Sequence, residues 1–244
     1  MSSSIANSRL PRWLLPPVLL LVAVCLMRPL ELRLSAPAMA SVPQLAILGG
    51  SGGTLAVLGG LRAAVAGGFW LRTNLAWERH DAAATTRLLH LTVAADERPL
   101  YFWLNGARML AYDLPEWRST GAPLAVRQRV AGEQAGIALE FLSTGLRAHA
   151  GTAELTIEMA NIRLRALDDR EGAARLFRQA AEKPGAPYYA ARIHAELLRE
   201  LGHPAEALAW LKQILPSLPA DDPAARREVV LARIKGLEQE TAGK

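Results

Sequence analysis

Residues 187–219 read PYYAARIHAELLRELGHPAEALAWLKQILPSLP, and the pattern in their second half already occurs once upstream. A small residue is followed four positions later by a large apolar one and then by another small or apolar one, and the set recurs after 34 residues. The equivalent pairs are Ala173 and Ala207, Phe177 and Leu211, and Ala180 and Ile214. Since this period is typical of helix–turn–helix repeats, the sequence predicts an all-α solenoid of paired helices.

Turn chemistry marks the ends of the predicted helices. Pro187 and Pro204 stand where first helical residues belong, because proline there loses no needed amide hydrogen bond. Gly202 can take the left-handed conformation that ends a helix. Ala195 and Ala207 are expected to face each other, since only small side chains let two helix backbones approach closely.

The second unit resembles a tetratricopeptide repeat, with the family's small, large, turn and closing-proline positions occupied. The residues that carry this resemblance are Ala195, Leu198, Gly202, Ala207, Leu211 and Pro219. The stretch from Gly59 to Asp113, through Phe69-Trp70-Leu71-Arg72 and Trp103, resembles bacterial membrane-anchored proteins of this repeat family. The resemblance covers about residues 58–219 and implies a divergent first repeat pair and no known activity.

Charge and composition favour a helical protein with a membrane-associated end. The chain has 244 residues, 51% of them hydrophobic and 21% charged, and a net charge of +5. Residues 152–219 hold nine basic and nine acidic residues, whereas residues 1–62 hold five arginines and one glutamate. This location suits anionic lipid headgroups and argues against a nucleic-acid partner, whose footprint would lie on the folded domain. Cys25 is the only cysteine, so no intramolecular disulfide is possible.

The first apolar run is Trp13–Met27, between Arg12 and Arg28. Its length of about 22 Å as a helix is short of a ~30 Å hydrocarbon core unless the flanking arginines extend toward the headgroups. We expect an uncleaved N-terminal transmembrane helix. The alternatives are a signal peptide cleaved after Ala38-Met39-Ala40 and a lipoprotein modified at Cys25.

Residues 45–68 are rich in glycine, and three interpretations stay open. A phosphate-binding loop at Gly49–Thr54 lacks the third glycine, the downstream acid and the alternating strands and helices of a dinucleotide site. A second membrane helix would place Gly49, Gly53, Gly60 and Gly67 near one face for close packing. The preferred interpretation is a flexible tether leading into an extended first repeat helix.

Further helices are expected on both sides of the repeat. Upstream, the pattern predicts helices at 63–79, 82–96 and 100–112, a flexible insertion between 115 and 134, and a helix at 135–146. Downstream, Asp222 is expected to cap a C-terminal helix that starts at Pro223. Its apolar stripe, Val230, Ile234 and Leu237, is typical of the terminal cap that a repeat stack requires.

No cluster of residues predicts an active site. None of the five histidines has a metal-ligand partner at the required spacing, and the paired acids Asp168-Asp169 and Asp221-Asp222 lie where helices start. No glycine-flanked nucleophilic serine and no complete phosphate loop is present. We therefore expect a protein that is not an enzyme and that uses no cofactor or metal.

The remaining expectation is binding through the concave face, which first helices of repeat pairs form. The predicted partner-binding residues are Tyr189, Arg192, Glu196, Arg199, Glu158, Ile162 and Arg165. The resemblance also raises the version of this fold that grips a peptide's C-terminal carboxylate. Arg192 fits its first basic position, but Glu196 stands where that clamp has asparagine, which argues against the clamp and not against a mixed-charge peptide.

The sequence thus divides into a membrane anchor (1–34), a glycine-rich linker or second membrane helix (35–62), divergent repeat-like helices (63–150) and repeats with a C-terminal cap (151–244). The leading hypothesis is a membrane-anchored adaptor of the bacterial inner membrane that binds a protein or peptide partner. A single span with its N-terminus in the cytoplasm would place the repeat domain in the periplasm. The alternative is a structural subunit of a membrane complex, with the glycine-rich helix packed in the membrane.

Overall fold

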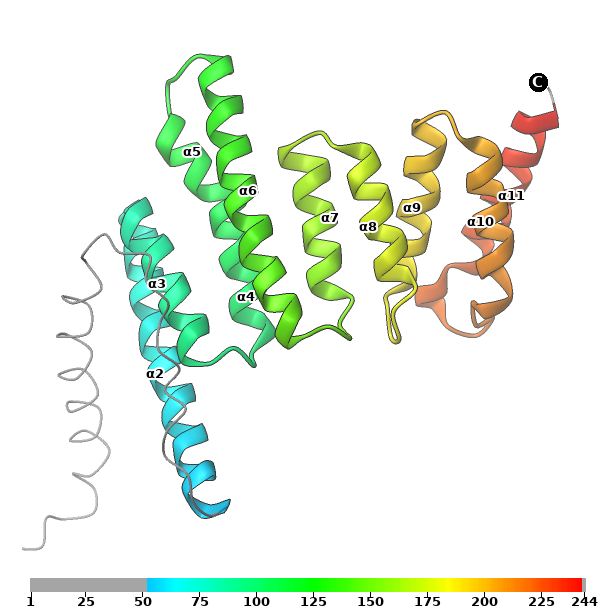
Figure 1. Cartoon of the computed structure of the whole chain (residues 1–244). Helices are drawn as coiled ribbons and strands as arrows, with labels where there is room; N and C mark the ends of the chain where they lie inside the picture. The colour runs from blue at the N-terminus through cyan, green and yellow to red at the C-terminus, as the bar shows by residue number, and fades with distance from the viewer. Residues whose placement is uncertain (1–51, 243–244) are drawn as a thin grey trace, which may run out of the picture. The chain divides into compact units, whose positions relative to one another are not determined.

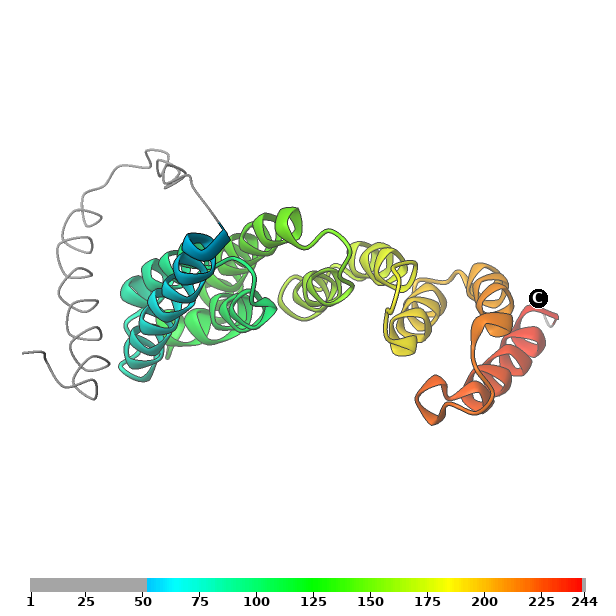
Figure 2. The ribbon, with the colours of Figure 1, turned by 90° about the horizontal axis from the view of Figure 1, so that it is seen from below.

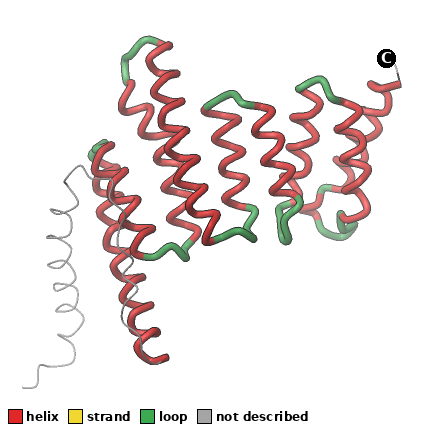
Figure 3. Tube along the Cα trace, in the orientation of Figure 1, coloured by secondary structure: helices red, strands yellow, loops and turns green. Residues whose placement is uncertain are grey.

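The computed structural model describes residues 52–242, and side chains from Gly60 onward. This part of the chain is built of helices joined by loops, with no strand in it, as expected for an all-α protein (Figures 1 and 3). Its helices are α2 (Gly52–Glu78), α3 (Ala82–Ala95), α4 (Leu100–Arg108), η2 (Met109–Asp113), α5 (Leu114–Ser119), α6 (Leu124–Ala148), α7 (Glu154–Ala166), α8 (Arg170–Ala181), α9 (Tyr188–Glu200), α10 (Pro204–Ile214), η3 (Leu215–Ser217), η4 (Pro223–Ala225) and α11 (Arg227–Ala242).

The glycine-rich stretch is helical where the structure describes it. Helix α2 begins at Gly52, so a flexible tether up to residue 62 is wrong for Gly52 onward. Contacts divide the chain into two units, Met1–Gly68 and Phe69–Lys244, with the division inside α2 rather than at residue 62. None of the described helices combines the length and the apolar character needed to cross a membrane. The expected anchor at Trp13–Met27 lies outside the described residues.

Within the unit Phe69–Lys244, consecutive helices from α6 onward pack against their neighbours in chain order. Helix α6 packs on α7, α7 on α8, α8 on α9, α9 on α10 and α10 on α11. Short loops at alternating ends make neighbouring helices antiparallel (Figure 1). Seen from below, α8 and α10 lie in one layer and α7 and α9 in the other (Figure 2).

Packing is continuous across the expected boundary at residue 150. Helix α7 contacts both α6 and α4. The Lys183 ammonium donates hydrogen bonds to the carbonyls of Ala150 and Thr152, at 3.1 and 2.7 Å, and to Thr156 Oγ1 at 2.9 Å. Burial lowers the pKa of Lys183. The loop after α8 is therefore tied to the loop before α7, and no unit begins at residue 151.

Five of the six positions of the 34-residue pattern lie in the core, and Ile214 is partly buried. Ala173 and Ala207 are fully buried, and so are Phe177 and Leu211. Ala195 and Ala207 belong to the same apolar cluster, as expected from their small side chains. Upstream, Ala138 and Leu142 on α6 are also fully buried.

Local signals placed most helix ends. Gly202 has φ +84°, which confirms the left-handed end of α9. Asp169 precedes α8 and accepts a hydrogen bond from the Gly172 amide at 2.7 Å. Pro204 is the first residue of α10, as predicted, whereas Pro187 lies one position before the start of α9.

Two segments differ from the expectation. In the expected flexible insertion at 115–134, a break of the helix does occur at residues 120–123, between α5 and α6. The rest of the segment is not an insertion, because Leu124–Ala148 is one helix whose Val130 and Gln134 are already buried. The C-terminal helix does not start at Pro223. Asp222 does cap Ala224 there, but it caps the short turn η4, and Arg226 in the left-handed region (φ 46°) separates this turn from α11. The stripe Val230, Ile234 and Leu237 is buried, as expected.

Candidate binding surface

Helix α9 carries four of the seven residues expected to bind a partner, and three of these four line one pocket. Tyr189, Arg192 and Glu196 border a cavity of about 330 Å³ between α9 and α11. Helix α11 contributes Val229, Val230 and Arg233 to its lining. Tyr189 is 44% exposed and Val229 is 46% exposed, so the rim offers aromatic and aliphatic surface beside cationic groups. Arg199 lies outside this lining.

Arg192 and Glu196 already have partners in the fold. The Arg192 guanidinium donates to the Ala225 carbonyl at 2.9 Å, and burial together with the nearby Arg226 lowers its pKa. Glu196 accepts a hydrogen bond from Arg199 at 2.6 Å and forms an ion pair with Arg233 of α11 at 2.9 Å. These contacts attach η4 and α11 to α9. Both residues are therefore structural as well as accessible, which the sequence pattern did not indicate.

The three expected residues on α7 are placed differently from one another. Ile162 is fully buried in the core with Leu155 and Leu110, so the expectation that it lines an open groove is wrong. Glu158 is only 3% exposed and accepts from Arg108 of α4 at 2.8 Å. Arg165 is exposed. Of the α7 set, only Arg165 presents its side chain to solvent.

A polar cluster that the sequence did not indicate surrounds Glu158. Burial, and next the charge of Glu158, raise the pKa of Tyr112 to about 12. The Tyr112 hydroxyl is buried without a hydrogen-bond partner. Tyr112 belongs to the π-helical turn η2, a type of helix distortion that is frequent at functional sites. The π-helical turn changes the helical register, and this change brings the Tyr112 ring beside α7. The 3.6-residue pattern of the sequence does not show such a change.

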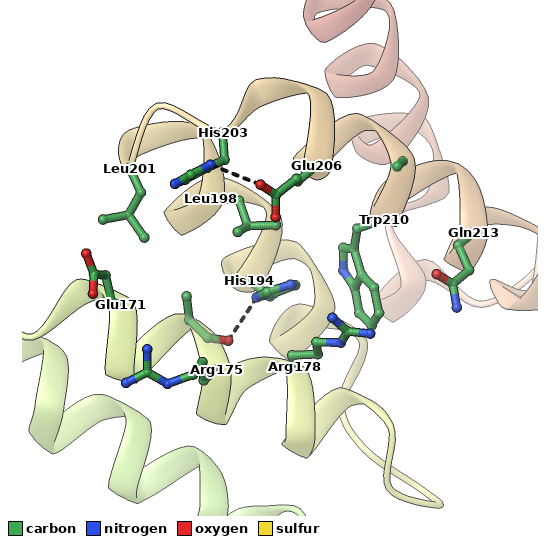
Figure 4. A pocket seen from close by; sticks show the side chains of 12 residues that line it. Glu171, Arg175, Arg178, His194, Leu198, Leu201, His203, Glu206, Trp210 and Gln213 are labelled. Atoms are coloured by element: carbon green, nitrogen blue, oxygen red, sulfur yellow. Dashed lines mark hydrogen bonds and ion pairs between the residues drawn. The ribbon is translucent and has the colours of Figure 1, made fainter.

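A larger pocket, of about 470 Å³, lies on the α8 and α10 side and shares no lining residue with the first (Figure 4). Its residues are Glu171, Ala174, Arg175 and Arg178 on α8, His194 and Leu198 on α9, Leu201 and His203 between α9 and α10, and Glu206, Ala209, Trp210 and Gln213 on α10. His194 lies at its centre, with Trp210 and Arg178 at one end and Glu171 at the other. The sequence offered no motif for this pocket, since its members come from three helices.

His80 and His203 lie beside turns between helices. His203 precedes α10 and contacts Glu206, with 3.0 Å between Nδ1 and Oε1, and His80 stacks on Trp117 beside the α2–α3 turn. In residues 52–242, no group of three or more His, Cys, Asp or Glu side chains could hold a metal ion.

Comparison with known proteins adds no relative. No family model matches the chain, and neither the curated proteins nor the solved structures contain a significant match.

Proposed function

We propose that residues 63–244 form a tetratricopeptide-like repeat stack that binds a partner protein or peptide without catalysis, and that residues 13–27 anchor it in the bacterial inner membrane with the repeats in the periplasm. The observation that supports binding most is the pocket between α9 and α11. Three residues chosen from the sequence pattern border it together with Val229 and Arg233.

The residue types at this pocket suit a peptide. Tyrosine and arginine are the side chains that most often dominate the energy of protein interfaces. Tyr189 projects from α9 with 44% of its surface exposed. Glu196 between two arginines adds a mixed-charge surface. A peptide carrying an apolar anchor with charged neighbours therefore fits better than a purely acidic one.

The repeat interpretation is supported by burial at equivalent positions. Ala173 and Ala207 both have zero exposure although they lie 34 residues apart, and each lies on the second helix of an antiparallel pair. Small residues at these positions let α8 approach α7 and let α10 approach α9. This arrangement is the one that helix–turn–helix repeats use.

A photo-crosslinking amino acid at Tyr189 tests the binding surface in cells. We expect a specific adduct from position 189 and none from Tyr101, a tyrosine of α4 that is 56% exposed. The crosslinked protein is then purified, and its affinity is measured for the Tyr189→Ala and Tyr101→Ala chains. Loss of affinity is expected only for Tyr189→Ala. The same adducts from both positions, or equal affinities, would place the working surface elsewhere.

The second candidate, a structural subunit of a membrane complex, is favoured by the glycines of α2. A Cβ added at Gly60 or Gly67 would meet nothing within 4 Å. The Gly60→Ala, Gly67→Ala double variant should therefore keep its own fold. Loss of assembly into a larger complex, seen as a shift on native gels, would support the structural-subunit function, and unchanged migration would oppose it.

A further inference from the structure

The 470 Å³ pocket between α8 and α10 is separate from the surface assigned to the proposed function. It has the size of sites that hold small ligands or a side chain with its flanking backbone, about 300–1,000 Å³. Its apolar lining comes from Ala174, Leu198, Ala209 and the Trp210 ring. The polar groups around this lining determine which ligand can enter.

His194 presents a hydrogen-bond acceptor to the pocket. Its Nδ1 lies 2.8 Å from the Ala174 carbonyl oxygen, and a carbonyl only accepts, so the proton of the neutral ring is on Nδ1. Burial lowers the pKa of His194, and the charge of Arg178 lowers it further. The hydrogen bond to Ala174 and the charges of Glu182 and Glu206 raise the pKa but do not outweigh burial. The ring is therefore neutral near pH 7, and Nε2 carries a lone pair without a proton.

Nε2 is accessible and unsatisfied within the described part of the chain. Three buried side-chain atoms there lack a hydrogen-bond partner: Thr85 Oγ1, Tyr112 Oη and Gln134 Oε1. Since His194 Nε2 also lacks a partner but is not among these buried atoms, it is accessible. The only hydrogen bond of the ring is the one from Nδ1. Trp210 packs edge-on against the ring at 5.0 Å but donates its own N–H to the Ala191 carbonyl. Figure 4 shows Nε2 directed away from Ala174, on the Trp210 side.

The charges that line the pocket balance. Two acids, Glu171 and Glu206, and two arginines, Arg175 and Arg178, border it, and Arg178 lies over Trp210 with its Cζ 5.6 Å from the ring centroid. The lining therefore gives no preference for a ligand of either charge, and a carboxylate at the centre would face the Nε2 lone pair of His194. A neutral group that combines an aromatic body with a hydrogen-bond donor satisfies both the apolar lining and Nε2.

We propose that this pocket takes an aromatic side chain that carries a hydrogen-bond donor, the phenol of a tyrosine or the indole of a tryptophan, presented by a partner protein. The ring lies among Leu198, Ala209 and Trp210, and its O–H or N–H donates to His194 Nε2. A phenylalanine fills the same space but leaves Nε2 unsatisfied.

The test titrates the full chain, labelled with ¹⁵N at its histidines and tryptophans, with N-acetyl-tyrosine amide and with N-acetyl-phenylalanine amide. The tyrosine compound should shift the His194 and Trp210 resonances and bind about 2- to 10-fold more tightly, the factor expected for one net hydrogen bond. Equal affinities of the two compounds, or no saturable shift at these residues, would overturn the proposal.

Substitutions on α10 provide matched controls. Ala209 lines the pocket and is exposed, so Ala209→Trp should fill the pocket and abolish binding of the tyrosine compound. Ala205, exposed on the same helix and outside the lining, serves as the control, and Ala205→Trp should bind normally. Gln213→Trp is the second blocking variant if Ala209→Trp fails to fold. Unchanged binding by a folded blocking variant would contradict the proposal.

The two surfaces are distinguished by Tyr189→Ala. That change removes a residue of the α9–α11 pocket and lies outside the α8–α10 pocket. Binding of N-acetyl-tyrosine amide should be unchanged in this variant. A loss there would show that the compound occupies the α9–α11 surface and would overturn the assignment to His194.

Discussion

At the scale of single residues, Ala207 tests how closely α9 and α10 approach. Ala207 is fully buried beside Ala195, whereas Ala209 is exposed on the same helix. Ala207→Leu should lower the free energy of unfolding by about 1–3 kcal/mol, because overpacking forces the two helices apart. Ala209→Leu should change it little. Thermal unfolding of both variants decides, and equal melting temperatures for Ala207→Leu and the parent would refute the close approach.

Two glycines of α6 form a matched pair with opposite expectations. A Cβ at Gly145 would lie 2.8 Å from Trp103, so Gly145→Ala should lower the free energy of unfolding by about 1–3 kcal/mol. A Cβ at Gly136 would meet nothing within 4 Å. Gly136→Ala should raise the free energy of unfolding by up to about 1 kcal/mol, since alanine favours helix interiors. Denaturant unfolding measures both, and changes of the same sign would contradict this packing.

His194 makes stability depend on pH. Burial holds its folded-state pKa below the usual 6.5, so the unfolded chain binds more protons between these two values. The contribution of neutral His194 to the free energy of unfolding is fully present above pH 6.5 and is lost as pH falls through the folded-state pKa. His90 acts in the same direction, also because of burial. The pKa of Asp169 is lowered by its hydrogen bond from Gly172, so its contribution changes only in more acidic solution.

We therefore expect the melting temperature to fall between pH 7.5 and 5.5. His194→Gln, which cannot take up a proton in this range, should show a smaller fall because only His90 remains of the two. A fall of the same size in both proteins would exclude His194 as a source of the pH dependence.

At the scale of elements, Arg192 of α9 is expected to contribute to stability, whereas Tyr189 of the same helix is not. The hydrogen bond of Arg192 to the Ala225 carbonyl holds η4, so Arg192→Ala should cost about 1 kcal/mol and loosen α11. Tyr189→Ala should leave thermal stability unchanged, since the ring is exposed. From the sequence alone, a chain that carries both Tyr189→Ala and Arg192→Ala is expected to keep its stability. Amide hydrogen exchange in α11 distinguishes the two expectations. Unchanged exchange in Arg192→Ala would favour the expectation that the substitution leaves stability intact.

At the scale of the whole molecule, the proposed anchor at Trp13–Met27 predicts on which side of a membrane the described helices lie. Arg9 and Arg12 precede the first apolar run, and Arg28 and Arg33 follow it with Glu31 between them. This slight bias favours an N-terminus in the cytoplasm. A fusion at Lys244 should then activate a periplasmic reporter. Activity of a cytoplasmic reporter only would indicate a second span or the opposite orientation.

The sequence by itself determined the features that depend on a few neighbouring residues. Gly202, Asp169 and Pro204 mark helix ends because φ preferences and side-chain caps act within about four residues. The 34-residue pattern placed Ala173 and Ala207 in the core, because small residues at a helical spacing indicate the side of a helix that packs against its neighbour. These local signals were enough for the ends of α8, α9 and α10 and for the three residues of α9 that border a pocket, but not for the starts of α2, α6 and α11.

Only the tertiary structure decided what those residues contact. Arg192 and Ala225 lie 33 positions apart, and His194 and Ala174 lie 20 apart, so no local preference links them. The burial of Ile162 follows from contacts of α7 with both α4 and α6, whereas its position in the helix pattern equally permits an open face. Helix signals determine where a side chain lies along its own helix, but the packing of neighbouring helices determines whether it is buried, tied to another element or free to bind.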